Sequence, residues 1–240
     1  MISEGKRTVL WRLVWFFALA AMMASLYTIF FYAPTERTMG EVQRVFYFHV
    51  PTAITAFLAF FLVFLASILF LIKKDRKWDH LARASAEVGL LLTTLVLITG
   101  SLWAKPVWNT WWTWDPRLTT TLVLWFIYVA YFMLRSAASG DTGARLAAVL
   151  GIVGFVDVPI VFMSIRWWRT IHPVTISPSG ILLEPAMLVT LQISLVAFLL
   201  FFIVLVRERY KMIVLAERLT FIKHMSLPVT GRFSALKEDN

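Results

Sequence analysis

Long apolar runs alternate with short polar segments along the whole chain of 240 residues. Each run approaches the roughly 20 helical residues that cross a bilayer core of about 30 Å. Because backbone polar groups in hydrocarbon must bond to one another, these runs are predicted to be α-helices. Six of them can be counted, at about Val9–Tyr32, Phe46–Ile72, Val88–Trp103, Thr119–Leu134, Leu146–Ile165 and Ala186–Val206.

This pattern predicts an all-α membrane protein built as a bundle of six transmembrane helices. The residue alternation that is typical of outer-membrane strands is absent from the sequence. We expect one transmembrane domain over residues 1–206 and a basic cytoplasmic tail over residues 207–240. The tail could lie along the membrane surface as an amphipathic helix.

The basic residues are divided unequally between the two ends of this bundle. The N-terminal segment, the loops after the second and fourth helices and the tail carry Lys6, Arg7, Arg12, Lys73, Lys74, Arg76, Lys77, Arg83, Arg135, Arg145, Arg207, Arg209, Lys211, Arg218, Lys223, Arg232 and Lys237. The opposite side carries Arg37, Arg44, Lys105, Arg117, Arg166 and Arg169. Since cytoplasmic loops are enriched in Lys and Arg, both termini are expected inside and three loops outside. The net charge of +9 then faces anionic membrane lipids and does not indicate nucleic-acid binding.

The composition excludes several kinds of site. Apolar residues make up 60% of the chain and there is no cysteine. Disulfides, thiolate metal sites and iron–sulfur ligation within the chain are therefore excluded. A Gly-rich phosphate loop followed by Lys-Ser/Thr is also missing, so the chain is not expected to bind ATP in that way.

Four tryptophans fall within seven positions of the second expected outer loop, in the stretch WNTWWTWDPRLTT. If this loop is helical, Trp108, Trp111 and Trp112 share one face and Trp114 points elsewhere. Asp115 followed by proline is a helix-start pattern, with the aspartate as N-cap. The alternative interpretation is an aromatic belt at the membrane surface, although a belt needs only one or two anchors per helix end. A belt accounts well for Trp11, Trp15 and Trp103.

Two of the four histidines are expected on the same side as these tryptophans. His49 stands in RVFYFHVPTA, where the second helix enters the membrane on an apolar face that includes Phe46. His172 stands in RWWRTIHPV, in the third outer loop. One interfacial histidine alone is more often structural, but two beside an aromatic surface favour a role as ligands. His80 and His224 fall among charges on the other side and are expected to be solvated.

Haem is a ligand that would use this set of side chains. Its iron takes axial imidazoles, its macrocycle packs on flat apolar groups, and its propionates pair with arginine. The cations available on this side are Arg44, Lys105, Arg117, Arg166 and Arg169. The residue types alone leave a quinone or another planar ligand open.

The flanking motifs carry a more specific resemblance. WNTWWTWDPRLTT resembles the tryptophan-rich signature of the haem-handling WWD family, W-G-x-x-W-x-W-D. With FHVP and WWRTIHPV in order, residues 40–205 resemble CcmC-type proteins of the cytochrome c maturation system I. The signature's usual glycine is Asn109 here, and asparagine tolerates a positive φ better than most residues do.

The resemblance implies a site and a set of partners. His49 and His172 match the two external axial ligands of haem b, and Arg117 matches a basic residue of the extended motif; Arg44 is a further candidate for the propionates. The predicted haem platform comprises Trp108, Trp111, Trp112, Trp114 and Asp115. The family works in the bacterial inner membrane with ABC-type transporter subunits, a small single-span subunit and a periplasmic haem chaperone.

These features lead us to expect a protein that binds haem at the outer face and promotes its transfer to the chaperone. Any lyase-like activity would come from presenting haem rather than from acid–base catalysis, since no nucleophile and base set is recognisable. Two alternatives remain open at this stage. One is a permease for haem or another planar substrate, for which Asp157 would be the strongest polar candidate in the spans. The other is an assembly scaffold without haem.

Overall fold

The computed structural model describes residues 4–138, 140–172, 176–177, 180–181 and 183–238, and it is almost entirely helical. Six stretches are long and apolar enough to cross a membrane, which confirms the predicted six-helix bundle. The helices are α1 (Glu4–Tyr27), α2 (Phe46–Lys73), α3 (Arg76–Trp108), α4 (Pro116–Ala137), α5 (Gly140–Gly154), α6 (Asp157–Trp167) and α7 (Pro185–Glu238). A π-helical turn, η1 (Thr28–Tyr32), continues α1, and a 3-10 turn, η2 (Glu41–Val45), leads into α2.

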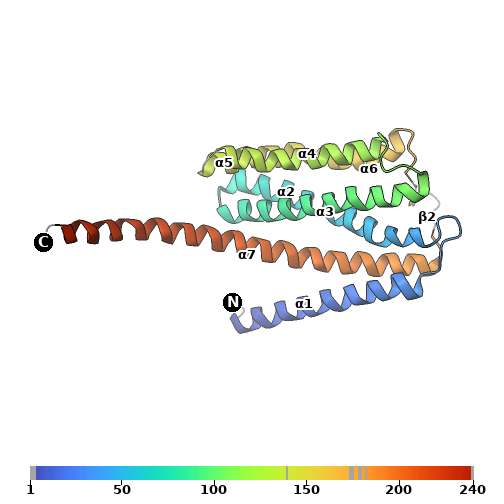
Figure 1. The fold of residues 1–240 in the computed structure, drawn as a ribbon, viewed down its shortest axis with the longest axis horizontal. Helices are drawn as coiled ribbons and strands as arrows, with labels where there is room; N and C mark the ends of the chain where they lie inside the picture. The colour runs from blue at the N-terminus through green and yellow to red at the C-terminus, as the bar shows by residue number, and fades with distance from the viewer. Residues whose placement is uncertain (1–3, 139, 173–175, 178–179, 182, 239–240) are drawn as a thin grey trace.

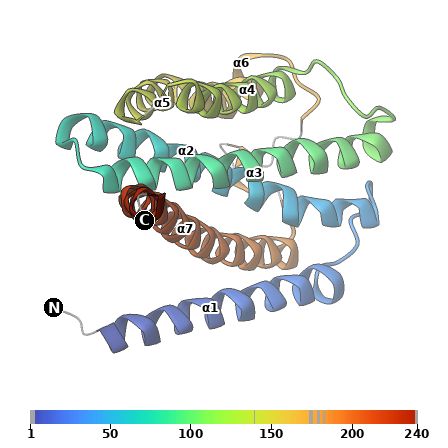
Figure 2. The same ribbon diagram turned by 60° about the vertical axis from the view of Figure 1, so that its left-hand side comes forward.

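The bundle is organised around the pair of helices α2 and α3, which pack against each other more extensively than any other pair. Figures 1 and 2 show α4, α5 and α6 on one side of this pair and α7 on the other. Helix α1 lies outermost and packs against α7. Most of its apolar side chains are exposed, as expected for a helix that faces lipid.

Small residues allow the central helices to approach closely. The rings of Phe60 on α2 and Tyr128 on α4 stack with centroids 3.7 Å apart. A methyl group added at Gly89 on α3 would come within 2.6 Å of the Phe60 ring. Such close contact through small residues is typical of helix packing in membranes, where dispersion replaces the hydrophobic effect.

The third span begins earlier than its apolar run suggested, at Arg76 instead of near Val88. Lys74 ends α2 in a left-handed conformation, and Asp75 then caps α3 by accepting a hydrogen bond from the backbone N–H of Lys77. The Lys77 side chain lies 2.8 Å from the same carboxylate, and these contacts hold the pKa of Asp75 below its usual value. Hydropathy misses this part of the helix because its first turns are charged.

The fifth span is broken, which the sequence did not predict. Helix α5 ends at Gly154 and α6 starts at Asp157, with a turn between them. One carboxylate oxygen of Asp157 is buried without a hydrogen-bond partner among the described residues. A short antiparallel hairpin, β1 (Ile176–Ser177) with β2 (Gly180–Ile181), also interrupts the expected all-helical pattern after α6.

The last helix runs through the predicted boundary at residue 206 without a break. Figure 1 shows it continuing past the ends of the other helices instead of turning aside. The expected tail is therefore helical but continues the axis of the last span, and it does not fold back across the bundle. The division into two domains remains a prediction.

Candidate functional site

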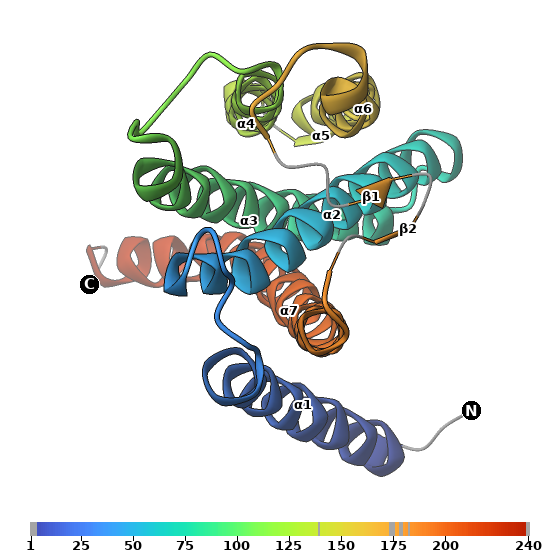
Figure 3. The same cartoon turned by 90° about the vertical axis from the view of Figure 1, so that its right-hand side faces the viewer.

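A cavity opens at one end of the bundle, between α2, α3, α4, α6 and the loops that follow α3 and α6. We call this the tryptophan end and the opposite one the basic end. Figure 3 looks onto the tryptophan end, where these two loops lie above the helix ends. Five of the residues predicted to hold haem line the cavity: His49, Trp108, Trp112, Arg117 and His172. Segments far apart in the chain thus bring the two histidines to one site.

His49 is buried in the wall of the cavity. Its position on α2, three residues after the buried Phe46, confirms the apolar face expected from the spacing. The ring lies edge-on to Trp103, with centroids 6.0 Å apart. A methyl group added at Gly100 on α3 would lie 3.2 Å from the imidazole, so a glycine there leaves the room that the ring occupies.

A hydrogen bond from α3 determines how the imidazole of His49 is presented. Its Nδ1 lies 2.9 Å from the hydroxyl of Thr99. That hydroxyl has a single hydrogen, which it donates to the carbonyl of Leu95 at 2.7 Å. Both contacts are satisfied together when the hydroxyl accepts from His49, and this arrangement assigns the proton to Nδ1 and leaves the lone pair on Nε2. A hydrogen bond of this kind to the second ring nitrogen is typical of metal-binding histidines.

His172 follows α6 in a segment that Asp115 holds in place. One oxygen of this buried carboxylate accepts from the backbone N–H of Arg117, which confirms the predicted N-cap of α4. The other oxygen accepts from the backbone N–H of Ile171 at 3.0 Å, across 56 positions of the chain. The N–H of His172 itself donates to the Thr170 hydroxyl. Asp115 thus joins the two loops of the site. Pro173, the next residue of the motif, lies outside the described residues.

The four tryptophans of the opening motif divide into two pairs. The helix ends at Trp108, because Asn109 takes a left-handed conformation with φ +56°, as its tolerance of positive φ allows. Residues 109–115 are not helical, so the face expected for Trp108, Trp111 and Trp112 does not form. Trp108 and Trp112 line the cavity, whereas Trp111 is 56% exposed and Trp114 is 75% exposed.

The candidate cations also divide into those that line the cavity and those that do not. Arg117 lines the cavity and forms no ion pair in the part of the chain that the structure describes. Arg44 is not part of the lining; it bonds to Glu41 and to the carbonyl of Ile29. Arg166 does line the cavity, although the sequence offered it only as one of several cations. Its position on the last turn of α6 brings it there.

Sequence reasoning missed part of this site. Trp103 is not an interface anchor: it is only 3% exposed and packs between Phe46, His49 and Trp108. Its indole N–H has no hydrogen-bond partner among the described residues. Thr99 could not be predicted as a site residue either. A threonine inside an apolar helix has no distinguishing sequence pattern, and its contact with His49 depends on how α2 packs against α3.

Taken together, the side chains around the cavity suit a flat, apolar, anionic ligand that bears a metal. Two imidazoles supply nitrogen donors and tryptophan rings supply flat walls. Arg117 supplies a positive charge that no described carboxylate pairs with. Trp103, whose indole N–H has no hydrogen-bond partner among the described residues, also lines the cavity.

Comparison with known proteins agrees with this chemistry. Residues 4–224 match the family described as heme exporter protein C, CcmC. The chain belongs to this family. It is 38% identical to heme exporter protein C of Haemophilus influenzae over 191 residues, which cover 78% of this chain and 77% of the relative.

Two further relatives are similar over comparable lengths. Heme exporter protein C of Escherichia coli K12 is 33% identical over 201 residues, 82% of each chain. A ccmC-like mitochondrial protein of Marchantia polymorpha, named as a putative cytochrome c biosynthesis protein, is 32% identical over 199 residues. That match covers 81% of this chain and 83% of the relative.

Proposed function

We propose that this protein binds haem b in the cavity at the tryptophan end, on the outer face of the bacterial inner membrane. It then presents the haem to a membrane-anchored periplasmic chaperone for cytochrome c biogenesis. The observation that carries the proposal is the meeting of His49 and His172 in one aromatic cavity. The family's description as a heme exporter supports a role in haem handling.

Different residues of the cavity would contact different parts of the haem. His49 and His172 would bind the iron, with the Nε2 of His49 turned to the metal by the Thr99 hydrogen bond. Trp108 and Trp112 would pack against the macrocycle, and Arg117 would pair with a propionate. Asp115 would position the two loops instead of contacting haem, because it is not among the residues that line the cavity and its oxygens accept from backbone N–H groups of both loops.

Transfer would rest on presentation and positioning rather than on acid–base chemistry. Trp111 and Trp114 expose their rings beside the cavity, where the chaperone could contact them. The absence of cysteine leaves no thiol to trap the vinyl groups of the haem. ABC-type transporter subunits and a small single-span subunit complete the proposed complex.

The absorption spectrum of the purified protein is the first test. The protein made in haem-replete cells should show a Soret band and contain close to one haem per chain. A colourless protein that also fails to bind added haem would favour the scaffold alternative. A permease predicts haem movement across liposomes by this chain alone, whereas our proposal predicts none.

The position of the site relative to the membrane has its own test. Reporter domains that are active only in the periplasm should work when fused at Asn109 and fail when fused at Asp141. This follows from the excess of basic residues at the end that carries Asp141. The reverse result would place the cavity on the cytoplasmic face and would exclude delivery to a periplasmic chaperone.

A further inference from the structure

Helix α7 is much longer than a membrane span requires. At about 1.5 Å per residue its 54 residues reach roughly 80 Å, more than twice the hydrocarbon thickness of about 30 Å. Four charged residues within Arg207–Lys211 mark where the helix leaves the hydrocarbon. The residues that follow continue the same axis beyond the bundle (Figure 1).

An apolar stripe runs along this extension. Met212, Leu215, Leu219 and Ile222 follow one another at spacings of three, four and three residues, and each is 58–61% exposed. This is the spacing of a coiled-coil seam, in which alternate positions three and four apart meet a partner helix. Exposed apolar side chains that are aligned in this way, outside the hydrocarbon, mark a contact surface.

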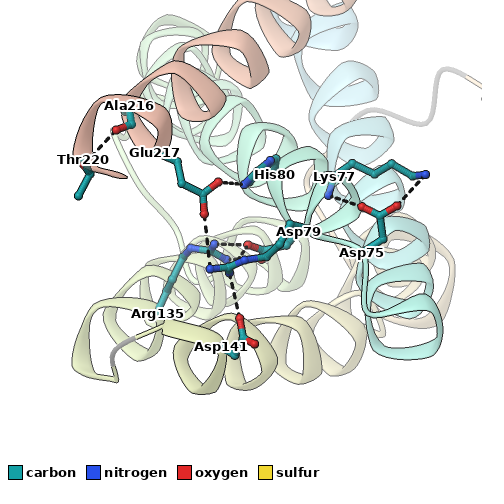
Figure 4. A network of polar contacts seen from close by, with 10 residues as sticks. Asp75, Lys77, Asp79, His80, Arg135, Asp141, Ala216, Glu217 and Thr220 are labelled. Carbon is teal, nitrogen blue, oxygen red and sulfur yellow. Dashed lines mark hydrogen bonds and ion pairs between the residues drawn. The ribbon is translucent and has the colours of Figure 1, made fainter. Parts of the chain in front are cut away.

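The opposite side of the same helix is already held by the bundle, which fixes the direction of the stripe. Glu217 lies 2.6 Å from the Nε2 of His80 (Figure 4). It also lies 3.5 Å from the guanidinium of Arg76. Arg209 bonds to Glu87 of α3, and Ile213 is buried in an apolar cluster that includes residues of α2 and α3. With three anchors on one side, the stripe cannot rotate inward to be covered by this chain.

The charges that flank the stripe itself are basic, and one of them, Lys211, also lies 3.2 Å from Glu208, one turn before the stripe begins. Lys211 and Arg218 flank it on one side and Lys223 on the other, all exposed. In a parallel pair of α7 helices Arg218 would face Lys223 of the second copy, and in an antiparallel pair Lys211 and Arg218 would face each other. Both arrangements repel, so a second copy is a poor occupant. A bilayer is also a poor one, because the helix axis continues that of a membrane span and points away from the surface.

We propose that this stripe docks a helical segment of another protein, on which an apolar seam is flanked by aspartate or glutamate. Its carboxylates would face Lys211, Arg218 and Lys223 while its apolar side chains cover the four stripe residues. The proposal does not depend on haem binding, since the stripe lies at the end of the bundle opposite the cavity.

Cysteine labelling tests the surface, because the chain has no cysteine of its own. Leu215→Cys and Leu219→Cys would be placed on the stripe in separate full-length variants. Phe221→Cys is the matched control: it is 66% exposed, but two residues past Leu219 it lies roughly 200° further round the helix. The rate of reaction with a water-soluble maleimide would be measured in native membranes of the source cells and in purified nanodiscs, one set zwitterionic and one rich in phosphatidylglycerol.

We expect both stripe cysteines to react at least tenfold more slowly in native membranes than in either nanodisc, with Phe221→Cys unchanged. Equal rates in all three preparations would overturn the proposal. Slow reaction in the anionic nanodiscs alone would identify the bilayer as the occupant, and slowing that grows with protein concentration would identify a second copy. Either result also contradicts the proposal.

Charge reversal tests the acidic character of the partner. In the Leu215→Cys background, Lys211→Glu with Arg218→Glu should restore fast labelling in native membranes. The control, Lys211→Arg with Arg218→Lys, should leave the cysteine protected. Protection that survives the reversal would show that the partner is not acidic.

Discussion

The two ends of this bundle each bury a histidine, and they treat it in opposite ways. At the basic end, the Nε2 of His80 lies 2.6 Å from the carboxylate of Glu217, within a network of ion pairs (Figure 4). At the tryptophan end, His49 bonds through Nδ1 to a neutral threonine hydroxyl and lines a cavity. His80 therefore links α3 to α7, whereas the Nε2 of His49 is the ring nitrogen that could bind a ligand.

The arginines at the two ends differ in a similar way, in whether a carboxylate within the protein pairs with them. Arg135 binds the buried Asp79 with two hydrogen bonds of 2.7 and 2.6 Å, so its charge is neutralised within the fold. Arg117 faces the cavity without an ion pair among the described residues. A buried polar group whose partners lie within the protein therefore indicates a structural role. A hydrogen-bonding or charged group that faces a cavity without such a partner indicates a ligand-binding role.

The largest effect is expected from the cavity histidines. The double variant His49→Ala/His172→Ala should lose haem affinity by more than the roughly 10–100-fold cost of removing an outer-shell partner. His80→Gln, which changes the histidine of the basic end, should keep wild-type haem content. Haem would be quantified per purified chain by the pyridine haemochrome assay. If His80→Gln lost haem as the double variant does, the contrast between the two ends would be wrong.

At the basic end the expected effect is on stability. Asp79 is 2% exposed, so Asp79→Ala leaves the partly buried Arg135 guanidinium without this partner. Removing one member of a buried pair costs about 3–5 kcal/mol. Asp141→Ala, whose exposed carboxylate faces Arg76 at 3.4 Å, should cost no more than about 1 kcal/mol. The Tm of both variants in detergent would measure the difference; equal values would show that the buried pair adds no more to stability than the exposed one.

Much of the fold could be predicted from the sequence, but only a few of the side-chain contacts in the site could. The six spans, the Asp115 cap and the apolar face of His49 follow from hydropathy, capping and periodicity, which are local properties. The path of residues 109–115 depends instead on the left-handed Asn109 and on the bond from Asp115 to Ile171, 56 positions away. The roles of Thr99 and Trp103 depend on their contacts with His49, and these can be recognised only once the packing of α2 against α3 is known.

A smaller effect is expected from Thr99, which orients His49. Thr99→Val removes the acceptor for the imidazole N–H and should weaken haem binding by about 10–100-fold, whereas Thr99→Ser should not. Thr94→Val is the matched control on the same helix, because its hydroxyl accepts instead from the indole of Trp125. Titration of haem into the apoprotein gives the affinities. The ¹⁵N spectrum of the histidine in the apoprotein reports the tautomer directly, and a proton on Nε2 of wild-type His49 would contradict the assignment.

The smallest effects should separate the two pairs of tryptophans. Trp108→Ala and Trp112→Ala should each weaken haem binding by a few-fold to about tenfold, in line with ~0.5–1.5 kcal/mol for an aromatic contact. Trp111→Ala and Trp114→Ala should retain haem but deliver less of it to the chaperone. Haem bound to each partner, per unit of this protein in membranes, measures both steps. Equal losses in all four variants, in step with protein abundance, would support an aromatic belt instead.

The central claim is that His49 and His172 bind the iron of one haem together. Electron paramagnetic resonance of the ferric protein at low temperature tests it most directly, because two imidazoles give a low-spin signal that differs from those of other ligand pairs. We predict this signal in the wild-type protein, its loss in His49→Ala and in His172→Ala, and its return when imidazole is added to either variant. A wild-type signal that persists in either variant would show that the replaced histidine is not an axial ligand.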